Sequence, residues 1–494
     1  MSRIRRGPYS HSGCRKCKQM RQKCDERRPS CSMCIKRGIK CQYLDFQIYG
    51  QSAPKVKLEK LEVSEDETND EVSDSSMNRP DGELWWYGPY NDWLKACKRV
   101  CPLTLSQQEL FRFLQEFFLQ SNFLFNFPFI RSDRNELMDT VRVLGPKYSV
   151  LDNVIYTVTS NALETQCKDS RWNKVKAKFM DVSYGHLVKL IAQGNTFEED
   201  VCTLFAIMLL FSERSTSYST IWRAHLKGAS GLLQRYKDRE IPIAGAENDR
   251  ELKAVETLYC ATRVWFASSE TAAWLSSTRG GIMTNREDLS QLLDSKKFAK
   301  LIPGAVVNGF NLGRGFGMDL DDLFTRTVLL EFDIHHDTIS SAEIENTAQQ
   351  LLTELDQVDQ MRYQFSEDQY DQKWTDFFNM SHQLYCKGLR LYIFLKILKR
   401  SCYSLKPLML QSIALAHRMP FRECLGIGIH WPLFMAGLCA VEIEHRAAIE
   451  DYLQEIVSRG IYVARVSLDR LRRCWEAVDF DVDPSEADFD SVVL

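Results

Sequence analysis

The chain has 494 residues, of which 44% are hydrophobic and 11% aromatic, so it is long enough for several domains and apolar enough to bury a core. A mini-protein and a largely disordered chain are therefore excluded. The net charge is only -3, but residues 1–43 contain thirteen lysines and arginines against two acids, which leaves the remainder strongly acidic. A basic head on an acidic body indicates a polyanionic partner for the head alone.

The first ten residues, MSRIRRGPYS, contain no apolar stretch of the kind that directs secretion. We therefore expect a reducing compartment, although the chain has sixteen cysteines. Residues 424–441 approach the uncharged length of a membrane-spanning helix, but they include His430, Pro432 and three glycines. The sequence predicts a buried helix preceded by a loop in this stretch, and no membrane partner.

Composition divides the chain into four segments. Residues 1–43 are basic and rich in cysteine, whereas 44–83 are acidic and rich in serine, which predicts a flexible linker. Apolar residues return at globular density from Leu84, and 84–475 is predicted to form one large helical domain. Residues 476–494 form an acidic tail with interspersed apolar side chains.

Helical periodicity runs through the predicted domain. Ser106 and Glu109 form a capping box ahead of apolar residues at the spacing of one helix face. The same periodicity recurs in further runs, at 201–210, 222–233, 344–355, 382–398 and 432–457. Gly460 is predicted to end the last run, and Pro432 to occupy its first helical position. Alternation with a period of two is scarce, so the predicted fold is mainly α-helical.

Six cysteines near the amino terminus repeat one spacing twice. The pattern Cys-x2-Cys-x6-Cys occurs at the positions Cys14, Cys17, Cys24 and again at Cys31, Cys34, Cys41. Zn²⁺ in structural sites takes four thiolate or imidazole ligands, so six thiolates complete two zinc sites only if two sulfurs bridge the ions. Disulfides are the alternative, but they conflict with the basic context without a secretory signal. Because this segment is too short to bury much apolar surface, the metal must supply its folding free energy.

The segment GCRKCKQMRQKCDERRPSCSMCIKRGIKC resembles the DNA-binding domain of fungal zinc binuclear-cluster (Zn2Cys6) transcription factors. The resemblance covers about 30 residues and includes all six cysteine spacings, Asp25 directly after the third cysteine, and Pro29 between the halves. It implies two zinc ions, with Cys14 and Cys31 as the bridging ligands. The implied terminal ligands are Cys17, Cys24, Cys34 and Cys41.

Five cations lie between Cys14 and Cys24, and we expect them to contact DNA: Arg15, Lys16, Lys18, Arg21 and Lys23. Their first effect is to neutralise phosphates and release counterions, so affinity should fall as salt rises. The resemblance assigns base reading in the major groove, at CGG-like triplets, to Arg21. The preceding position is usually basic in the family but is Met20 here, which changes the contacts at this end of the helix.

Two stretches of the body resemble the helical regulatory region that follows such clusters, the fungal-specific transcription factor domain. They are 222–229 and 431–437, with an LRRCW stretch near the end of the domain. We interpret the large apolar side chains of these stretches as part of the core between packed helices. Gly228 and Gly437 are predicted to allow close helix approach.

An enzymatic body is not predicted. Residues 304–317 are rich in glycine but lack the lysine and hydroxyl residue of a phosphate-binding loop, and the patterns GxGxxG, HExxH and GxSxG are absent. The run His335, His336, Asp337 is interpreted as a solvated surface, because adjacent side chains point to different faces.

The tail at 476–494 alternates acids with apolar residues, which is typical of segments that bind coactivators. The sequence thus predicts a nuclear regulator of RNA polymerase II transcription, more often activator than repressor, that binds double-stranded DNA and forms a possible homodimer. The alternative is a helical enzyme or interaction scaffold that carries an accessory zinc module.

Overall fold

The computed structural model describes residues 24–25, 31–37 and 39 near the amino terminus and most of 100–479. The gaps within the larger part are 122–135, 193–194, 216–219, 240–248, 367–369, 420–428 and 459–462. The chain divides into two compact units, Met1–Ser75 and Ser76–Leu494. The predicted linker at 44–83 lies outside the described residues, as does the chain beyond Asp479.

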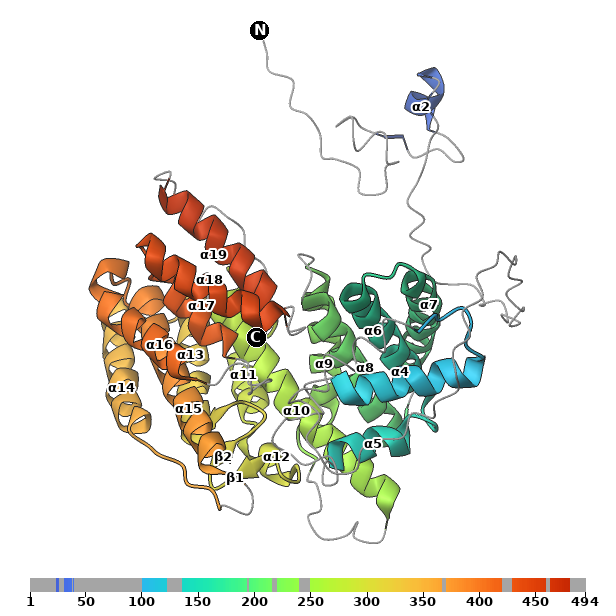
Figure 1. Ribbon diagram of the computed structural model, residues 1–494, viewed down its shortest axis with the longest axis horizontal. Helices are drawn as coiled ribbons and strands as arrows, with labels where there is room; N and C mark the ends of the chain where they lie inside the picture. Colours follow the sequence, from blue (N-terminus) through green and yellow to red (C-terminus); the bar gives the residue numbers. More distant parts are fainter. Residues whose placement is uncertain are drawn as a thin grey trace. The chain divides into compact units, whose positions relative to one another are not determined.

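The body unit is built almost entirely of helices, as predicted (Figure 1). The helices before the longest one are α4 (Gln107–Ser121), α5 (Glu136–Leu144), α6 (Ser149–Cys167), α7 (Arg171–Ala192), α8 (Phe197–Ser215) and α9 (Ile221–Arg235). The longest described helix is α10 (Arg250–Ser276), followed by α11 (Arg286–Leu293) and α12 (Lys296–Leu301). The later helices are α13 (Met318–His335), α14 (Ser341–Asp359), α15 (Gln372–Tyr392), α16 (Lys406–Arg418), α17 (His430–Leu438), α18 (Ile443–Ser458) and α19 (Val463–Asp479).

Helix α10 passes through the middle of the body (Figure 1). It packs against α5 and α8 of the earlier helices and against α12 and α13 of the later ones. The Asp249 side chain starts the helix by accepting hydrogen bonds from the backbone amides of Glu251 and Leu252. Most of the side chains of α10 are buried on every face, as expected for a central helix. One hydrophobic core therefore runs through both groups of helices.

The predicted helix starts and runs are mostly confirmed. At the start of α4, the Ser106 amide donates to Glu109 Oε2 at 2.8 Å and the Glu109 amide donates to Ser106 Oγ at 3.4 Å, which completes the capping box. The run at 382–398 continues past α15 as a π-helix, η3 (Ile393–Ile397). The four other runs fall in α8, α9, α14 and the α17 to α18 region.

The prediction of a single helix over 432–457 is wrong, because the structure has two helices in this range. Helix α17 ends at Leu438 and α18 begins at Ile443. The Arg446 guanidinium donates to the Ala440 carbonyl at 3.1 Å, so the break is held by a charged donor. Pro432 is the third residue of α17 and not the first, although it still lies in the first turn, where its missing amide costs no hydrogen bond. Gly460 lies outside the described residues.

The glycine-rich stretch at 304–317 forms a small antiparallel sheet. Its strands are β1 (Val306–Val307), β2 (Phe310–Asn311) and β3 (Phe316–Gly317), paired in the order β1-β2-β3. Gly304, Gly309 and Gly315 have positive φ values of 72°, 80° and 78°. A Cβ atom at Gly317 would lie 1.6 Å from the hydroxyl of Tyr363. The glycines therefore serve turns and one close packing contact.

Gly228 and Gly437, which the sequence predicts to allow close helix approach, differ in the space around them. A Cβ atom at Gly437 would lie 2.5 Å from Leu471 Cδ1 and 3.2 Å from Ile449 Cγ2, so this glycine allows α17 to approach α18 and α19 closely. A Cβ atom at Gly228 would have its nearest neighbours at 3.9 and 4.0 Å, both on Ile207, which is ordinary contact. The prediction of close approach is confirmed for Gly437 and wrong for Gly228, because the neighbouring helix leaves room for a methyl group there.

Arginines from two distant helices bind the backbone at the end of α10. Arg223 of α9 donates to two carbonyl oxygens of the loop 277–281 at 2.9 and 3.0 Å and to the Ser277 hydroxyl at 2.8 Å. Arg470 of α19 donates to the Ser276 carbonyl at 2.7 Å. The Ser276 carbonyl is at the helix end and lacks an intrahelical donor, so Arg470 satisfies it. Arg223 instead binds carbonyl groups of the loop that follows the helix.

Glu270 lies beneath the same loop and is fully buried. Its Oε1 accepts hydrogen bonds from the Trp274 indole at 3.0 Å and from the backbone amides of 282–283 at 2.9 and 3.0 Å. Burial raises the pKa of Glu270 to about 7. A Cβ atom at Gly281 would lie 2.2 Å from Glu270 Oε1, so the loop closes on this carboxyl group only because the residue is glycine.

Within the residues that the structure describes, no helix is both long enough and apolar enough to cross a bilayer. Helix α17, in the stretch that came closest by sequence, is buried in the body. His335, His336 and Asp337 are exposed at the end of α13, in agreement with the solvated surface predicted for them.

Candidate zinc cluster and nucleic-acid interface

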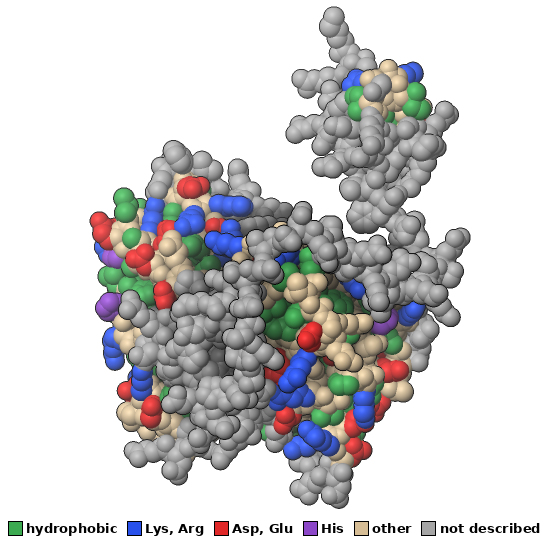
Figure 2. All heavy atoms as spheres, turned by 45° about the vertical axis from the view of Figure 1, so that its right-hand side comes forward, with side chains coloured by type: hydrophobic (Ala, Val, Ile, Leu, Met, Phe, Trp, Pro, Cys, Tyr) green, Lys and Arg blue, Asp and Glu red, His purple; other side chains and the backbone are tan. Residues whose placement is uncertain are grey.

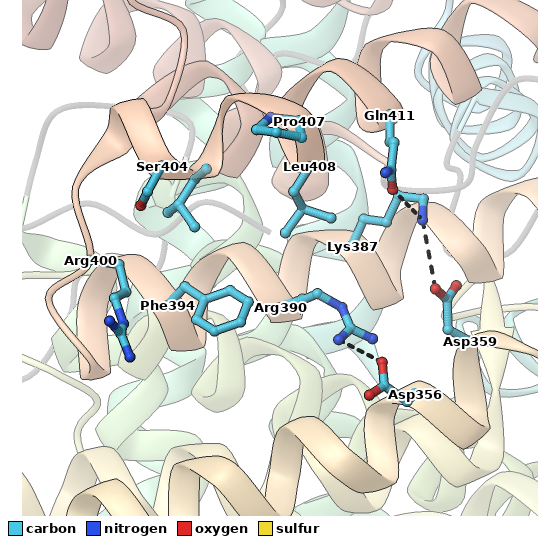
Figure 3. A pocket seen from close by; sticks show the side chains of 11 residues that line it. Asp356, Asp359, Lys387, Arg390, Phe394, Arg400, Ser404, Pro407, Leu408 and Gln411 are labelled. Carbon is cyan, nitrogen blue, oxygen red and sulfur yellow. Dashed lines mark hydrogen bonds and ion pairs between the residues drawn. The ribbon is translucent and has the colours of Figure 1, made fainter.

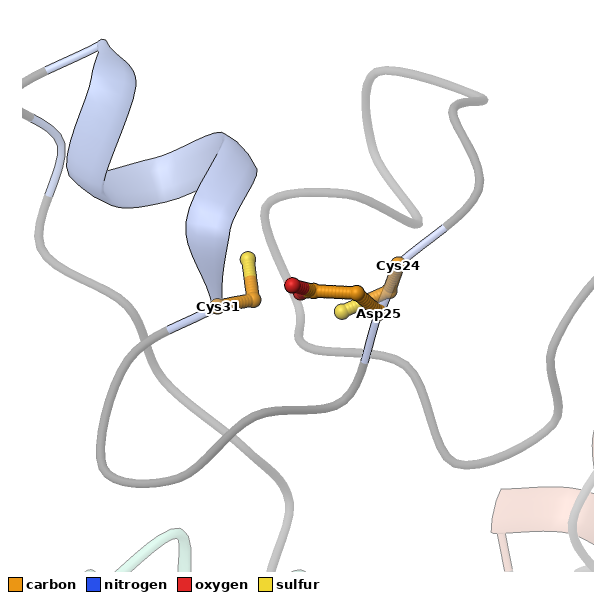
Figure 4. Close-up of side chains that lie close together, drawn as sticks. All are labelled: Cys24, Asp25 and Cys31. Carbon is orange, nitrogen blue, oxygen red and sulfur yellow. The ribbon is translucent and has the colours of Figure 1, made fainter.

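Two of the predicted zinc ligands meet at the start of helix α2 (Ser32–Lys36). The sulfur atoms of Cys24 and Cys31 and a carboxylate oxygen of Asp25 all lie within 4.8 Å of one another. Figure 4 shows these three side chains converging on one point. Cys24 is 5% exposed, and Cys31 and Cys34 are both 0% exposed. Buried sulfur donors that face one another in so small a segment are the arrangement that a soft cation requires.

The helix α2 explains why Cys31 and Cys34 lie close together. Cys31 is the N-cap residue, with an extended backbone, and its Sγ accepts a hydrogen bond from the Cys34 amide at 3.4 Å. The Ile35 amide donates to the Cys31 carbonyl at 3.0 Å and closes the first turn. An amide donor at a helix N-terminus stabilises a thiolate, because both the N–H group and the helix dipole favour negative charge.

Asp25 has a structural role that the cysteine spacing does not reveal. Its two carboxylate oxygens accept hydrogen bonds from the Ser32 amide, at 3.1 and 3.3 Å. The carboxylate thereby caps an amide of the first turn of α2 and ties the third cysteine to the second half of the cluster. The signal in the sequence was an acid directly after Cys24, just ahead of the next Cys-x2-Cys pair.

The structure brings together only part of the predicted site. Cys24, Cys31 and Cys34 are described and buried. Outside the described residues lie the ligands Cys14, Cys17 and Cys41 and the predicted DNA contacts Arg15, Lys16, Lys18, Arg21 and Lys23. Lys36 and Arg37, at the end of α2, are exposed.

The described donors fit Zn²⁺. Thiolates are preferred ligands of structural zinc, and a helix N-terminus offsets part of their negative charge. Cys24, Cys31 and Cys34 are the described residues that would hold the metal, and zinc supplies a cross-link that fixes the short segment. Cys31 lies near Cys24 in space and binds the Cys34 amide, so it contacts residues of both halves.

The body presents a different charge pattern. On the face drawn in Figure 2, lysines and arginines are interspersed with aspartates and glutamates where the surface is described. Mixed charges of this kind give no concentrated positive field over the described part of that face. The large excess of cations is in the head sequence, at 1–43.

Comparison with known proteins assigns both units. A family model described as "Fungal Zn(2)-Cys(6) binuclear cluster domain" matches residues 12–48 and thus spans all six cysteines. A second model, "Fungal specific transcription factor domain", matches residues 112–493, which is most of the chain. The cluster domain binds two zinc ions, as predicted.

Sterol uptake control protein 2 of Saccharomyces cerevisiae is 34% identical over 90 residues. These residues make up 18% of this chain and 9% of that protein, so the match spans less than a tenth of the relative's length. No solved structure matches the chain. From the two family matches, the chain belongs to the fungal transcription factors that combine a Zn(2)-Cys(6) binuclear cluster with a fungal specific transcription factor domain.

Proposed function

We propose that the chain is a nuclear, sequence-specific DNA-binding regulator of RNA polymerase II transcription that reads CGG-like triplets in the major groove. Residues 1–43 form the DNA-binding domain, 44–83 a flexible linker, 84–475 the regulatory domain and 476–494 an activating tail. The observation that carries the proposal is the repeated Cys-x2-Cys-x6-Cys pattern, matched as a binuclear cluster, within a strongly basic head.

Six thiolates hold the two ions in this proposal. Cys14 and Cys31 bridge them, and the terminal ligands are Cys17, Cys24, Cys34 and Cys41. The proximity of Cys24 and Cys31 and the burial of Cys34 support this assignment. Because the head has few large apolar side chains, the metal cross-link holds the shape that fits the duplex.

Binding to DNA divides into two kinds of contact. Arg15, Lys16, Lys18 and Lys23 neutralise phosphates, which gives affinity without sequence preference. Arg21 reads guanine through its O6 and N7 atoms, because a guanidinium donates two parallel hydrogen bonds to that edge. Met20 has no hydrogen-bond donor on its side chain, so this position adds no polar contact.

The remaining chain supplies regulation in this proposal. The acidic tail keeps its apolar side chains soluble until a coactivator groove binds them, which makes the protein an activator. Pairing of two chains would let two heads bind two half-sites, and the proposal includes a homodimer on that basis.

The test uses the full-length chain and two labelled duplexes, one containing CGG triplets and one of scrambled sequence. Fluorescence anisotropy should give tighter binding to the first duplex, a steep fall in affinity from 50 to 200 mM salt, and loss of binding after zinc chelation. Arg21→Ala should lower the preference for the CGG duplex by about 1–3 kcal/mol.

Arg418→Ala is the matched control, because Arg418 is an exposed arginine of the body. It should change neither affinity nor preference. Equal losses on both duplexes for Arg21→Ala would make Arg21 a phosphate contact, and equal affinity of the unaltered chain for both duplexes would refute sequence-specific binding.

A further inference from the structure

A cavity of about 590 Å³ opens on the body, away from the zinc cluster segment in sequence. Its walls come from α14, α15, α16, the π-helix η3 and the short 3-10 helix η4 (Cys402–Leu405). The volume lies in the range that small-molecule sites occupy. Figure 3 shows charged side chains along one wall, with Pro407 and Leu408 across the cavity from them.

Two cations on the α15 wall are held in place by acids of α14. Arg390 Nη1 lies 2.7 Å from Asp356 Oδ1, and Lys387 Nζ lies 3.6 Å from Asp359 Oδ2. Lys387 also donates to Gln411 Oε1 at 3.4 Å. The two cationic side chains are only 17% and 16% exposed, so they are fixed parts of the wall.

Arg400 lies at the opposite end of the cavity from Lys387 (Figure 3). The π-helix η3 ends at Ile397, and Lys399 follows it with a positive φ of 52°. The Arg400 amide then donates to the Phe394 carbonyl at 2.8 Å. This turn fixes the backbone from which the Arg400 side chain extends. The Arg400 guanidinium forms no ion pair with any residue that the structure describes, and the side chain is exposed.

The middle of the cavity is apolar. Phe394 lies between Arg400 and Arg390, and Pro407 and Leu408 of α16 face it across the cavity (Figure 3). Leu405 of η4 also lines the cavity. Lys387, Arg390 and Phe394 share one face of the helix because they are spaced by three and four residues. Together with Arg400, this wall therefore presents charge at its two ends and an aromatic ring between them.

The ion pairs among the residues that line the cavity determine which charge a ligand should have. Both acids of the cavity already have a cation, whereas Arg400 has no acidic partner among the described residues. A cationic ligand would have to break an existing ion pair, but an anion would find a guanidinium available. An apolar group attached to that anion would cover Phe394 and Leu408 and gain free energy from their burial.

We propose that this cavity binds a small organic carboxylate with an apolar body, whose carboxylate pairs with Arg400 and whose apolar part lies against Phe394, Leu405 and Leu408. A guanidinium binds a carboxylate through two parallel hydrogen bonds, which makes Arg400 the main determinant of charge preference. The site lies in the regulatory domain and does not rest on DNA reading by the head.

The experiment measures binding to the full-length chain by isothermal titration calorimetry at concentrations below the micellar range. Octanoate is the probe, and octanol, octylamine and octyl phosphate have the same apolar body with other headgroups. We expect saturable binding of octanoate at one site, with octanol and octylamine at least about tenfold weaker, the size of one charged hydrogen bond. Octyl phosphate should not bind more tightly than octanoate.

Three variants locate the site. Arg400→Gln should weaken octanoate binding about tenfold or more and bring it to the level of octanol. Ser404→Trp, at an exposed rim position, should also weaken binding because the indole fills part of the cavity. Arg418→Gln is the control, since Arg418 is exposed and does not line the cavity, and it should bind octanoate as the unaltered chain does.

Absence of saturable octanoate binding would refute the site, and unchanged binding by Arg400→Gln would refute its position. Equal binding of octanol would refute recognition of the charge, and tighter binding of octyl phosphate would refute the carboxylate class. DNA affinity of the head, measured separately, distinguishes failure here from failure of the proposed function.

Discussion

The close packing around Gly437 can be tested by adding a single methyl group. In Gly437→Ala the new Cβ would lie 2.5 and 2.9 Å from the two methyl carbons of Leu471 and 3.2 Å from Ile449 Cγ2. Leu471 is 0% exposed, so its methyl groups are enclosed by the core and do not face solvent. The Trp475 indole donates to the Gly437 carbonyl at 2.9 Å and fixes the distance between α17 and α19.

The expected cost follows from overpacking. Extra methyl groups forced into a filled core cost about 1–3 kcal/mol, while replacing a helical glycine by alanine returns up to about 1 kcal/mol. Gly228→Ala is the matched control, because its Cβ would meet only Ile207, at 3.9 and 4.0 Å. The control should leave stability unchanged or raise it by up to about 1 kcal/mol. We therefore expect Gly437→Ala to be less stable than Gly228→Ala by about 1–3 kcal/mol.

The difference in stability between Gly437→Ala and Gly228→Ala is measured by urea unfolding of the full-length chain, followed by far-ultraviolet circular dichroism. It is calculated from the midpoint urea concentrations of the two variants, with the same dependence of the free energy of unfolding on urea for both. Leu471→Ala removes the two methyl groups that the new Cβ would meet. Combined with Gly437→Ala, it should show a favourable coupling energy in a double-mutant cycle. Equal stability of the two alanine variants, or strict additivity in the cycle, would contradict the packing argument.

Further predictions concern charge, hydrogen bonding and metal. Because the pKa of Glu270 is raised from 4.5 to about 7 by burial, the folded chain retains a proton that the unfolded chain releases. The free energy of unfolding should therefore fall by about 3 kcal/mol as pH rises from about 4.5 to about 7 and change no further above that from this group. Glu270→Gln should remove this part of the slope in urea titrations at several pH values, and an unchanged slope would refute the assignment. Arg223→Lys should lower the free energy of unfolding by about 1–3 kcal/mol, because an ammonium group does not reproduce the guanidinium contacts with the loop after α10; an unaltered melting temperature would count against this. Cys14→Ala should leave less than two zinc ions per chain by elemental analysis, because its thiolate is predicted to bridge both ions, and Cys101→Ala in the body should retain two. A Cys14→Ala chain that still carries two ions would refute the bridge.

Elements set by local interactions were predictable from the sequence. The capping box of Ser106 and Glu109 involves residues three apart, and its hydrogen bonds are those expected. The long helices followed from the spacing of apolar residues, because helix formation on a core needs only one apolar face. The break between α17 and α18 was missed because Arg446 stabilises it from the next helix, and apolar periodicity carries no information about such a contact.

The candidate zinc cluster and the cavity likewise contain features that the sequence predicts and features that depend on the fold. The ligand type and the two-ion stoichiometry followed from the spacing of the cysteines, since coordination chemistry fixes how many thiolates each zinc needs. The contact between Asp25 and the Ser32 amide was not predictable from that count, because it depends on how the loop between the two halves folds back. The cavity beside Arg400 gave no sequence signal, because its walls come from separate helices and meet only in the folded body.

One physical reason explains why some features were predictable from the sequence and others were not. A metal site is specified by a few identical ligands at short spacing, so a single segment contains nearly all the information needed to recognise it. The body is specified by contacts between residues far apart in sequence, such as Arg223 with the loop at 277–281 and Arg470 with Ser276. A single arginine in the sequence has the same appearance whether it is solvated, caps a buried helix end or faces a cavity. Only the fold separates these roles: Arg223 and Arg470 bind backbone carbonyls at and after the end of α10, whereas Arg400 lines a cavity.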